Sequence, residues 1–282
     1  MKRKKVITMI ATALAFTMTV CGSSTAIAAS ELTAESKPAT QYTIDANQEV
    51  YALLDFEDTA EFENATKGLL ASPDTLDICD ENGKVVWSQT AYAFLDQDAP
   101  DTANPSLWRD TQLNHIYGLF EVTDGIYQVR GYDMSNVTFI KGDTGWIVVD
   151  PLMSVECAQA ALALVEENLG TFPVKAVIYS HSHVDHFGGV KGIVSEEEVQ
   201  AGNVQVIAPE GFEKHAVSEN IYAGTAMGRR ASYQYGTMLE GGETGSLAIG
   251  IGMGQSKGRT SYISPTLRRG WHRPLQRFIH QM

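Results

Sequence analysis

The feature that most constrains the fold is a short apolar run that leads directly into a polar, histidine-rich loop. Residues 176–179, Ala-Val-Ile-Tyr, are unbroken in apolar character, which is typical of a strand buried on both faces. The residues that follow, 180–189, read Ser-His-Ser-His-Val-Asp-His-Phe-Gly-Gly. A buried strand that ends in such a loop delivers polar side chains to one edge of a sheet, where they can converge.

Three strand patterns and a helix pattern precede this buried strand. The strands are expected at residues 126–129, 137–140 and 146–149, and the helix is expected from about Ser154 to Leu169, where apolar residues recur at helical spacing. The order strand, strand, strand, helix, strand predicts an α/β fold built of packed layers.

The region before residue 118 is less regular. Residues 29 to about 48 are rich in Ala, Ser and Thr and predict a tether. A helix is expected to open near residues 50–54, a short strand at 84–87, and a loop over 99–108 because that stretch contains two prolines. We expect residues 29–117 to combine the tether with a segment that wraps around the α/β part.

The N-terminus predicts export. Four basic residues open the chain, apolar residues 6–20 follow, and Ala26-Ile27-Ala28 offers the small residues of a cleavage site, so residues 1–28 form a signal-peptide pattern. The apolar run is too short for a comfortable membrane span, and a periplasmic or extracellular address is expected. A lipid anchor at Cys21 is the minor alternative, because Val20 is bulkier than lipoprotein signals favour.

Composition excludes several classes of protein. The 282 residues carry 34 acidic and 21 basic side chains, a net charge of -13 that argues against a nucleic-acid binder. The 44% hydrophobic content supplies a core and excludes disorder as the dominant state. Three cysteines are too few for a disulfide-stapled fold, and Cys79 and Cys157 are expected to be buried thiols.

The loop after the buried strand supplies four candidate metal ligands: His181, His183, Asp185 and His186. Imidazole nitrogens suit zinc, and a nearby carboxylate extends a site or holds a second ion. His181 and His183 project to the same side of an extended backbone, whereas Asp185 and His186 on a tight turn can aim at a second point. The remaining histidines are single occurrences and are expected to be surface or packing residues: His115, His215, His272 and His280.

Residues 181–186 resemble the HxHxDH signature of the metallo-β-lactamase superfamily, and Asp150 matches the aspartate that supports the floor of its site. Further blocks resemble the alkyl sulfatase branch, whose members include the linear primary-alkylsulfatases. These blocks are residues 104–109, 118–122, 208–212, 215–220 and 226–231. The resemblance runs from about Tyr51 to Thr266. It implies that residues 118–266 form the N-terminal half of an αββα sandwich, which is incomplete in this chain.

The resemblance also implies a chemistry. By this resemblance, His181 and His183 would ligate one zinc ion, and Asp185 and His186 would ligate another. Metal-activated water would then hydrolyse a small alkyl sulfate ester to an alcohol and sulfate. The residue that protonates the leaving alcohol is not indicated. The family is homodimeric through a region that this chain does not contain. The motif alone also fits a superfamily hydrolase of a lactone, lactam or phosphoester, or a non-catalytic metal-binding remnant.

The chain departs from the family near its end. The family's remaining ligands, two glutamates and a histidine, follow the equivalent of Thr266, and residues 244–282 here contain six basic and no acidic residues. We hypothesise that residues 267–282, an atypical basic tail, come from a shifted reading frame or another truncation; a genuine surface-binding tail is the alternative. This chain is therefore expected to show low or no sulfatase activity and substoichiometric zinc.

Overall fold

The computed structural model describes residues 37–239, 242 and 245–269. The described residues from Pro38 onward belong to one compact unit. The expected signal peptide and most of the expected basic tail, including His272 and His280, lie outside the described residues. Within the part of the chain that is described, no helix is both long and apolar enough to cross a membrane.

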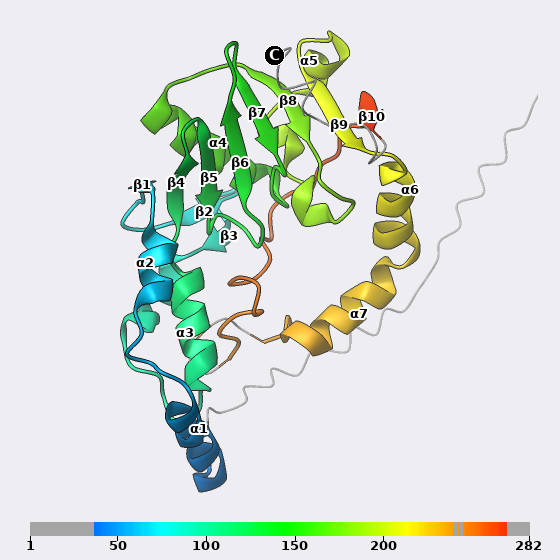
Figure 1. Ribbon diagram of the computed structural model, residues 1–282. Coiled ribbons are helices and arrows are strands. Elements are labelled where there is room, and N and C mark those ends of the chain that lie inside the picture. Colours follow the sequence, from blue (N-terminus) through cyan, green and yellow to red (C-terminus); the bar gives the residue numbers. More distant parts are fainter. Residues whose placement is uncertain (1–36, 240–241, 243–244, 270–282) are drawn as a thin grey trace, which may run out of the picture. The chain divides into compact units, whose positions relative to one another are not determined.

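One eight-stranded mixed sheet forms the centre of this unit (Figure 1). Its first five strands in spatial order pair antiparallel, and the pairs from β7 to β10 are parallel. In spatial order the strands are β1 (Leu69–Ala71), β4 (Gly118–Thr123), β5 (Ile126–Arg130), β6 (Val137–Lys141), β7 (Trp146–Val149), β8 (Val174–Ile178), β9 (Gln205–Pro209) and β10 (Leu267–Arg269).

The strands predicted from the sequence are present as β5, β6, β7 and β8. The buried strand begins two residues earlier than its apolar run suggested, because Val174 already pairs with Trp146, and it ends at Ile178, one residue before Tyr179. Tyr179 is nevertheless fully buried. The predicted α/β class is confirmed, and the described residues hold one large sheet with helices against it, as the N-terminal half of an αββα sandwich requires.

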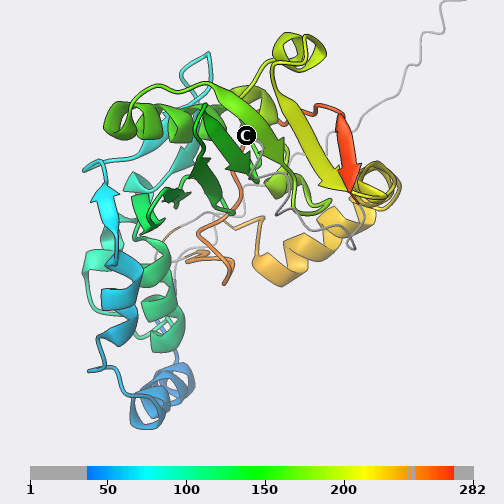
Figure 2. The ribbon, with the colours of Figure 1, turned by 45° about the horizontal axis from the view of Figure 1, so that its top comes forward.

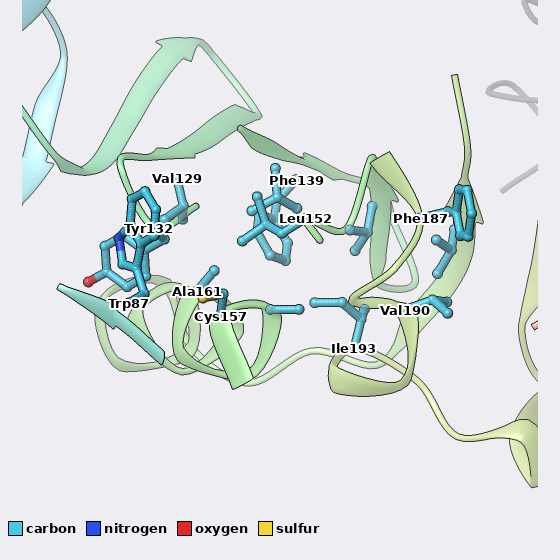
Figure 3. Close-up of a cluster of buried hydrophobic side chains, with 14 of the residues drawn as sticks. Trp87, Val129, Tyr132, Phe139, Leu152, Cys157, Ala161, Phe187, Val190 and Ile193 are labelled. Atoms are coloured by element: carbon cyan, nitrogen blue, oxygen red, sulfur yellow. The ribbon is translucent and has the colours of Figure 1, made fainter. Parts of the chain in front are cut away.

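Helix α4 (Val155–Leu169) connects β7 to β8 and covers one face of the sheet. It begins where predicted, because the Ser154 side chain accepts a hydrogen bond from the Cys157 backbone N–H and caps the first turn. Figure 3 shows Cys157 and Ala161 of α4 facing Val129, Phe139 and Leu152 across the core. A helical crossover of this kind is what two neighbouring parallel strands require.

The segment before β4 has more regular structure than predicted. It contains helices α1 (Gln41–Leu53), α2 (Ala60–Thr66) and α3 (Pro105–Asn114), the 3-10 helix η1 (Thr90–Asp96), and a hairpin of β2 (Asp77–Cys79) and β3 (Val85–Ser88). Helix α4 contacts β2, and the Trp87 side chain of β3 donates to the Gly131 carbonyl just after β5, so the hairpin meets both the helix and the end of the sheet.

Three expectations for this segment are wrong. The helix expected to open near residues 50–54 is α1, which instead ends there. The tether expected to about residue 48 includes most of α1, a helix with no buried residue and therefore no apolar stripe to reveal it. The loop expected over 99–108 ends early, because the Asn104 side chain caps α3 and Pro105 occupies its first position. The prolines thus mark a helix start as well as a turn.

The cysteine prediction is half right. Cys157 is buried in the core, whereas Cys79 is exposed, and both are free thiols. Cys79 follows the buried Ile78 in β2, so the alternation of the strand turns it to the outside.

After β8 the chain forms short helices and then an arm. The short helices are η2 (Val184–His186), η3 (Val190–Gly192) and α5 (Glu196–Gln200). The arm follows β9 and consists of α6 (Phe212–Val217), the π-helix η4 (Ser218–Tyr222) and α7 (Gly224–Tyr235). In both ribbon views α6 lies beside β9 and α7 leads away from the sheet (Figure 2).

Candidate metal centre

The candidate ligands follow the carboxyl ends of two neighbouring parallel strands. Val149 of β7 pairs with Ile178 of β8, and the next residue, Asp150, donates its backbone N–H to the Ile178 carbonyl at 2.9 Å. Parallel strands end at the same sheet edge, which is where open α/β sheets bind their ligands. Asp150 therefore lies beside the histidine-rich loop although thirty residues separate them in sequence.

The turn that carries Asp150 is strained. Asp150 and Leu152 have φ angles of 55° and 59°, in the left-handed region that residues with a side chain seldom adopt. Leu152 is fully buried and its N–H donates to the Asp150 carbonyl at 2.8 Å, so packing and a tight turn hold the conformation. Strain of this kind persists where the surrounding structure over-determines it and is frequent at functional sites.

Two glycines let the histidine-rich loop pack onto this turn. The Gly189 N–H donates to the Leu152 carbonyl at 2.9 Å, and a Cβ at Gly189 would collide with the Pro151 carbonyl oxygen. A Cβ at Gly188 would likewise collide with the Met153 carbonyl oxygen. These close approaches place the loop directly against the Asp150 turn.

Asp150, His181 and His186 each bring one potential ligand atom within 4.8 Å of the others. Ser180 connects the first two: its N–H and Oγ reach Asp150 Oδ1 and Oδ2 at 2.7 and 2.6 Å, and its Oγ lies 2.9 Å from His181 Nδ1. Because the single hydroxyl proton goes to the carboxylate, His181 Nδ1 must donate to Ser180 Oγ. Burial and the neighbouring His186 and His183 lower the pKa of His181, so its Nε2 keeps a free lone pair.

His186 lies between two carboxylates. Its Nδ1 hydrogen-bonds Asp150 Oδ2 at 2.9 Å and its Nε2 lies 3.0 Å from Asp185 Oδ2. Burial alone would lower the pKa of His186, but the contacts to Asp150 and Asp185 outweigh it and raise the pKa to about 9. Burial also opposes ionisation of Asp185, yet the bond to His186 lowers the pKa of that carboxyl overall. Without a metal ion, a protonated His186 can donate one N–H to each of the two carboxylates.

His183 is turned toward a residue that the sequence did not indicate. Its ring stays beside His181, with centroids 4.6 Å apart, but it is not part of the three-residue group. Its Nε2 lies 3.0 Å from Oε1 of Glu219, on the π-helix of the arm. No local spacing connects positions 183 and 219, so only the fold could reveal this contact.

The other two histidines among the described residues do not join the site. His115 is half-buried and its Nδ1 hydrogen-bonds the Gln89 side chain at 2.8 Å, and His215 is exposed on α6. A separate cavity of about 440 Å³ lies between β3, the end of α7 and residues 253–257, and none of the candidate ligands lines it. The imidazoles of His181 and His186 and the carboxylate of Asp150 form a donor set that suits zinc.

Comparisons with known proteins agree with this geometry. The sequence profile of the metallo-beta-lactamase superfamily matches residues 130–271. A linear primary-alkylsulfatase from a Pseudomonas species is 50% identical over 233 residues, which cover 82% of this chain and 35% of the relative. An alkyl/aryl-sulfatase of Saccharomyces cerevisiae is 48% identical over 226 residues and also covered to 35%. The chain thus spans about a third of the length of these relatives.

A solved structure shares the fold. The inverting sec-alkylsulfatase Pisa1 from a Pseudomonas species superposes with a TM-score of 0.79 at 48% sequence identity, over 83% of this chain and 37% of the other. The profile match covers half of the chain and includes both Asp150 and the whole histidine-rich loop. The chain therefore belongs to the metallo-beta-lactamase superfamily.

Proposed function

We propose that this chain is the zinc-binding part of an exported alkyl sulfate ester hydrolase. The observation that carries the proposal is the convergence of Asp150, His181 and His186 at one sheet edge, in a chain about half identical to alkylsulfatases over most of its length. The basic and apolar N-terminal pattern supports export, and the family resemblance supports a homodimer with an alkyl sulfate as its small-molecule substrate.

The resemblance to the alkyl sulfatases suggests roles for the residues. His181 and His183 would hold one zinc ion and Asp185 and His186 a second. Bound zinc would act as a Lewis acid and supply an activated water. Asp150, through Ser180, keeps His181 Nδ1 protonated and its Nε2 available, and it orients His186 through Nδ1. Asp150 is therefore a supporting residue, with both carboxylate oxygens already engaged in hydrogen bonds.

A chimeric enzyme tests the sulfatase function. Residues 118–266 of this chain replace the corresponding segment of the Pseudomonas linear primary-alkylsulfatase, and sulfate release from dodecyl sulfate is measured beside turnover of a lactone and a β-lactam. We expect sulfate release from the chimera and its loss in the same chimera carrying His181→Ala. A folded, zinc-loaded chimera that hydrolyses only the lactone or the β-lactam would show that the segment serves another reaction.

The chain as given is tested by metal counting. We expect zinc bound at less than two ions per chain and little or no release of sulfate from dodecyl sulfate. Absence of any bound transition metal after dialysis against zinc would refute the metal-binding role. Two tightly bound zinc ions with dodecyl sulfate turnover would instead show that the chain needs no further ligands.

A further inference from the structure

The arm after β9 reaches back to the candidate metal centre at one point. We propose that Glu219 is a positioning residue for His183: its carboxylate accepts the Nε2–H of the imidazole and so leaves Nδ1 as the nitrogen for metal. The inference rests on the proposed zinc site. It adds to that site a residue from an element that lies outside the histidine motif.

The first support is the contact itself. His183 Nε2 lies 3.0 Å from Glu219 Oε1, within reach of a charge-assisted hydrogen bond. A carboxylate only accepts, so the imidazole nitrogen that faces it must carry the proton. In a neutral imidazole the lone pair is then on Nδ1, and the His183 ring is still 4.6 Å from the ring of His181.

The second support is the parallel with His181. Ser180, whose hydroxyl donates to Asp150, accepts from His181 Nδ1 and leaves Nε2 of that ring free, whereas Glu219 engages His183 Nε2 and leaves its Nδ1 free. Metal-ligating histidines characteristically donate their other N–H to a carboxylate or a similar acceptor, which fixes both tautomer and ring orientation. Of the described side chains, only Glu219 forms an ion pair with His183.

The third support is how the arm is anchored. Phe212 at the start of α6 is buried, stacks on Tyr179 with ring centroids 5.2 Å apart and meets Phe187 edge-on at 5.4 Å. Tyr179 precedes the histidine-rich loop, and Phe187 lies in it directly after His186. The same aromatic cluster therefore holds both the loop that carries His183 and the helix that leads to Glu219.

The fourth support is the π-helix between α6 and α7. The Ala223 N–H donates to the Ser218 carbonyl at 3.0 Å, five residues back, so η4 contains an extra residue per turn. Such turns are rare and occur disproportionately at functional sites. Here the π-turn contains Glu219, whose side chain is 28% exposed against 57% for His183. The Glu219 carboxylate is therefore less exposed to solvent than the His183 imidazole, and it can restrain the orientation of that ring.

Glu219→Ala and Glu219→Gln test the proposal, with Glu210→Ala as a matched control at an exposed glutamate outside the site. Zinc affinity is measured on the full chain by competition with a chromophoric chelator. We expect Glu219→Ala to weaken binding about ten- to hundredfold, Glu219→Gln to recover part of that loss because an amide oxygen still accepts, and Glu210→Ala to match the wild type. Equal or tighter binding by Glu219→Ala would overturn the proposal.

A second measurement does not need the metal. In the metal-free protein, imidazole ¹⁵N shifts should report the Nε2–H tautomer of His183, and Glu219→Ala should move the ring toward a mixture of tautomers. An unchanged tautomer overturns the role of Glu219 even if zinc binds. A wild-type chain that binds no zinc, while its His183 shifts respond to Glu219→Ala, overturns the proposed function and leaves the orientation of His183 by Glu219 supported.

Discussion

The pKa of His186 predicts how the stability of the metal-free protein changes with pH. A histidine has a pKa near 6.5 when unfolded, and the carboxylates of Asp150 and Asp185 raise the pKa of His186 to about 9 in the folded protein. The folded state therefore holds this proton more tightly than the unfolded state. The resulting stabilisation is complete below about pH 6.5 and is lost as the pH rises through about 9.

The size of the effect follows from the shift. A change from 6.5 to about 9 corresponds to about 3 kcal/mol of folding free energy. The His186 side chain is 23% exposed, so solvent screens the pair only in part. The lowered pKa of Asp185 changes stability in the opposite direction, because its stabilisation is lost as the pH falls through that pKa. This loss occurs at acidic pH, below the range of the experiment that follows.

Urea unfolding in the presence of a chelator measures the effect. The wild type and His186→Gln are compared from about pH 6 to about pH 10, and the difference in unfolding free energy is taken at each pH. Groups such as His115, whose pKa is lowered by burial, are common to both proteins and cancel. We expect the difference to fall by about 3 kcal/mol over this range. A difference that stays constant with pH would refute a protonated His186 between the two carboxylates.

Three further substitutions test the packing and the hydrogen bonds around the site. Ser180→Ala should weaken zinc binding about tenfold or more in a competition assay, because it frees the tautomer of His181, whereas Ser182→Ala should not. Gly189→Ala should lower the unfolding free energy by about 1–3 kcal/mol, since a Cβ meets the Pro151 carbonyl, and Gly224→Ala, in open space on a helix, should be neutral or stabilising. Phe212→Ala should lower the unfolding free energy by about 3–5 kcal/mol in urea and should also weaken zinc binding. Lower stability with unchanged zinc binding would show that the aromatic cluster does not help to position the metal ligands.

The central α/β unit could be predicted because its patterns are local. The strands around Val129, Phe139 and Val148 and the helix capped by Ser154 each show their periodicity within a few residues. The wrapping segment was harder to predict for a physical reason: α1 buries nothing, so no apolar stripe reveals it. The start of α3 could have been found, since Asn104 followed by Pro105 is a standard helix-start signal.

The site shows the same limit. The clustering of His181, His183 and His186 is visible in the sequence because they lie within six positions. The contacts that set their protonation are of two kinds. Those from Ser180 and Asp185 are near in sequence, whereas those from Asp150 and Glu219 depend on strand pairing and on the arm after β9. Sequence reasoning from residue spacing alone cannot find the second kind.

The left-handed backbone at Asp150 limits which amino acids this position can accept. Aspartate and asparagine enter that conformation more readily than other residues with a side chain. Glutamate carries the same charge but lacks this tolerance, so it would have to distort the turn after β7 in order to reach Ser180 and His186. Charge and backbone geometry thus select the same residue independently, and asparagine is the substitution that removes the charge while preserving the turn.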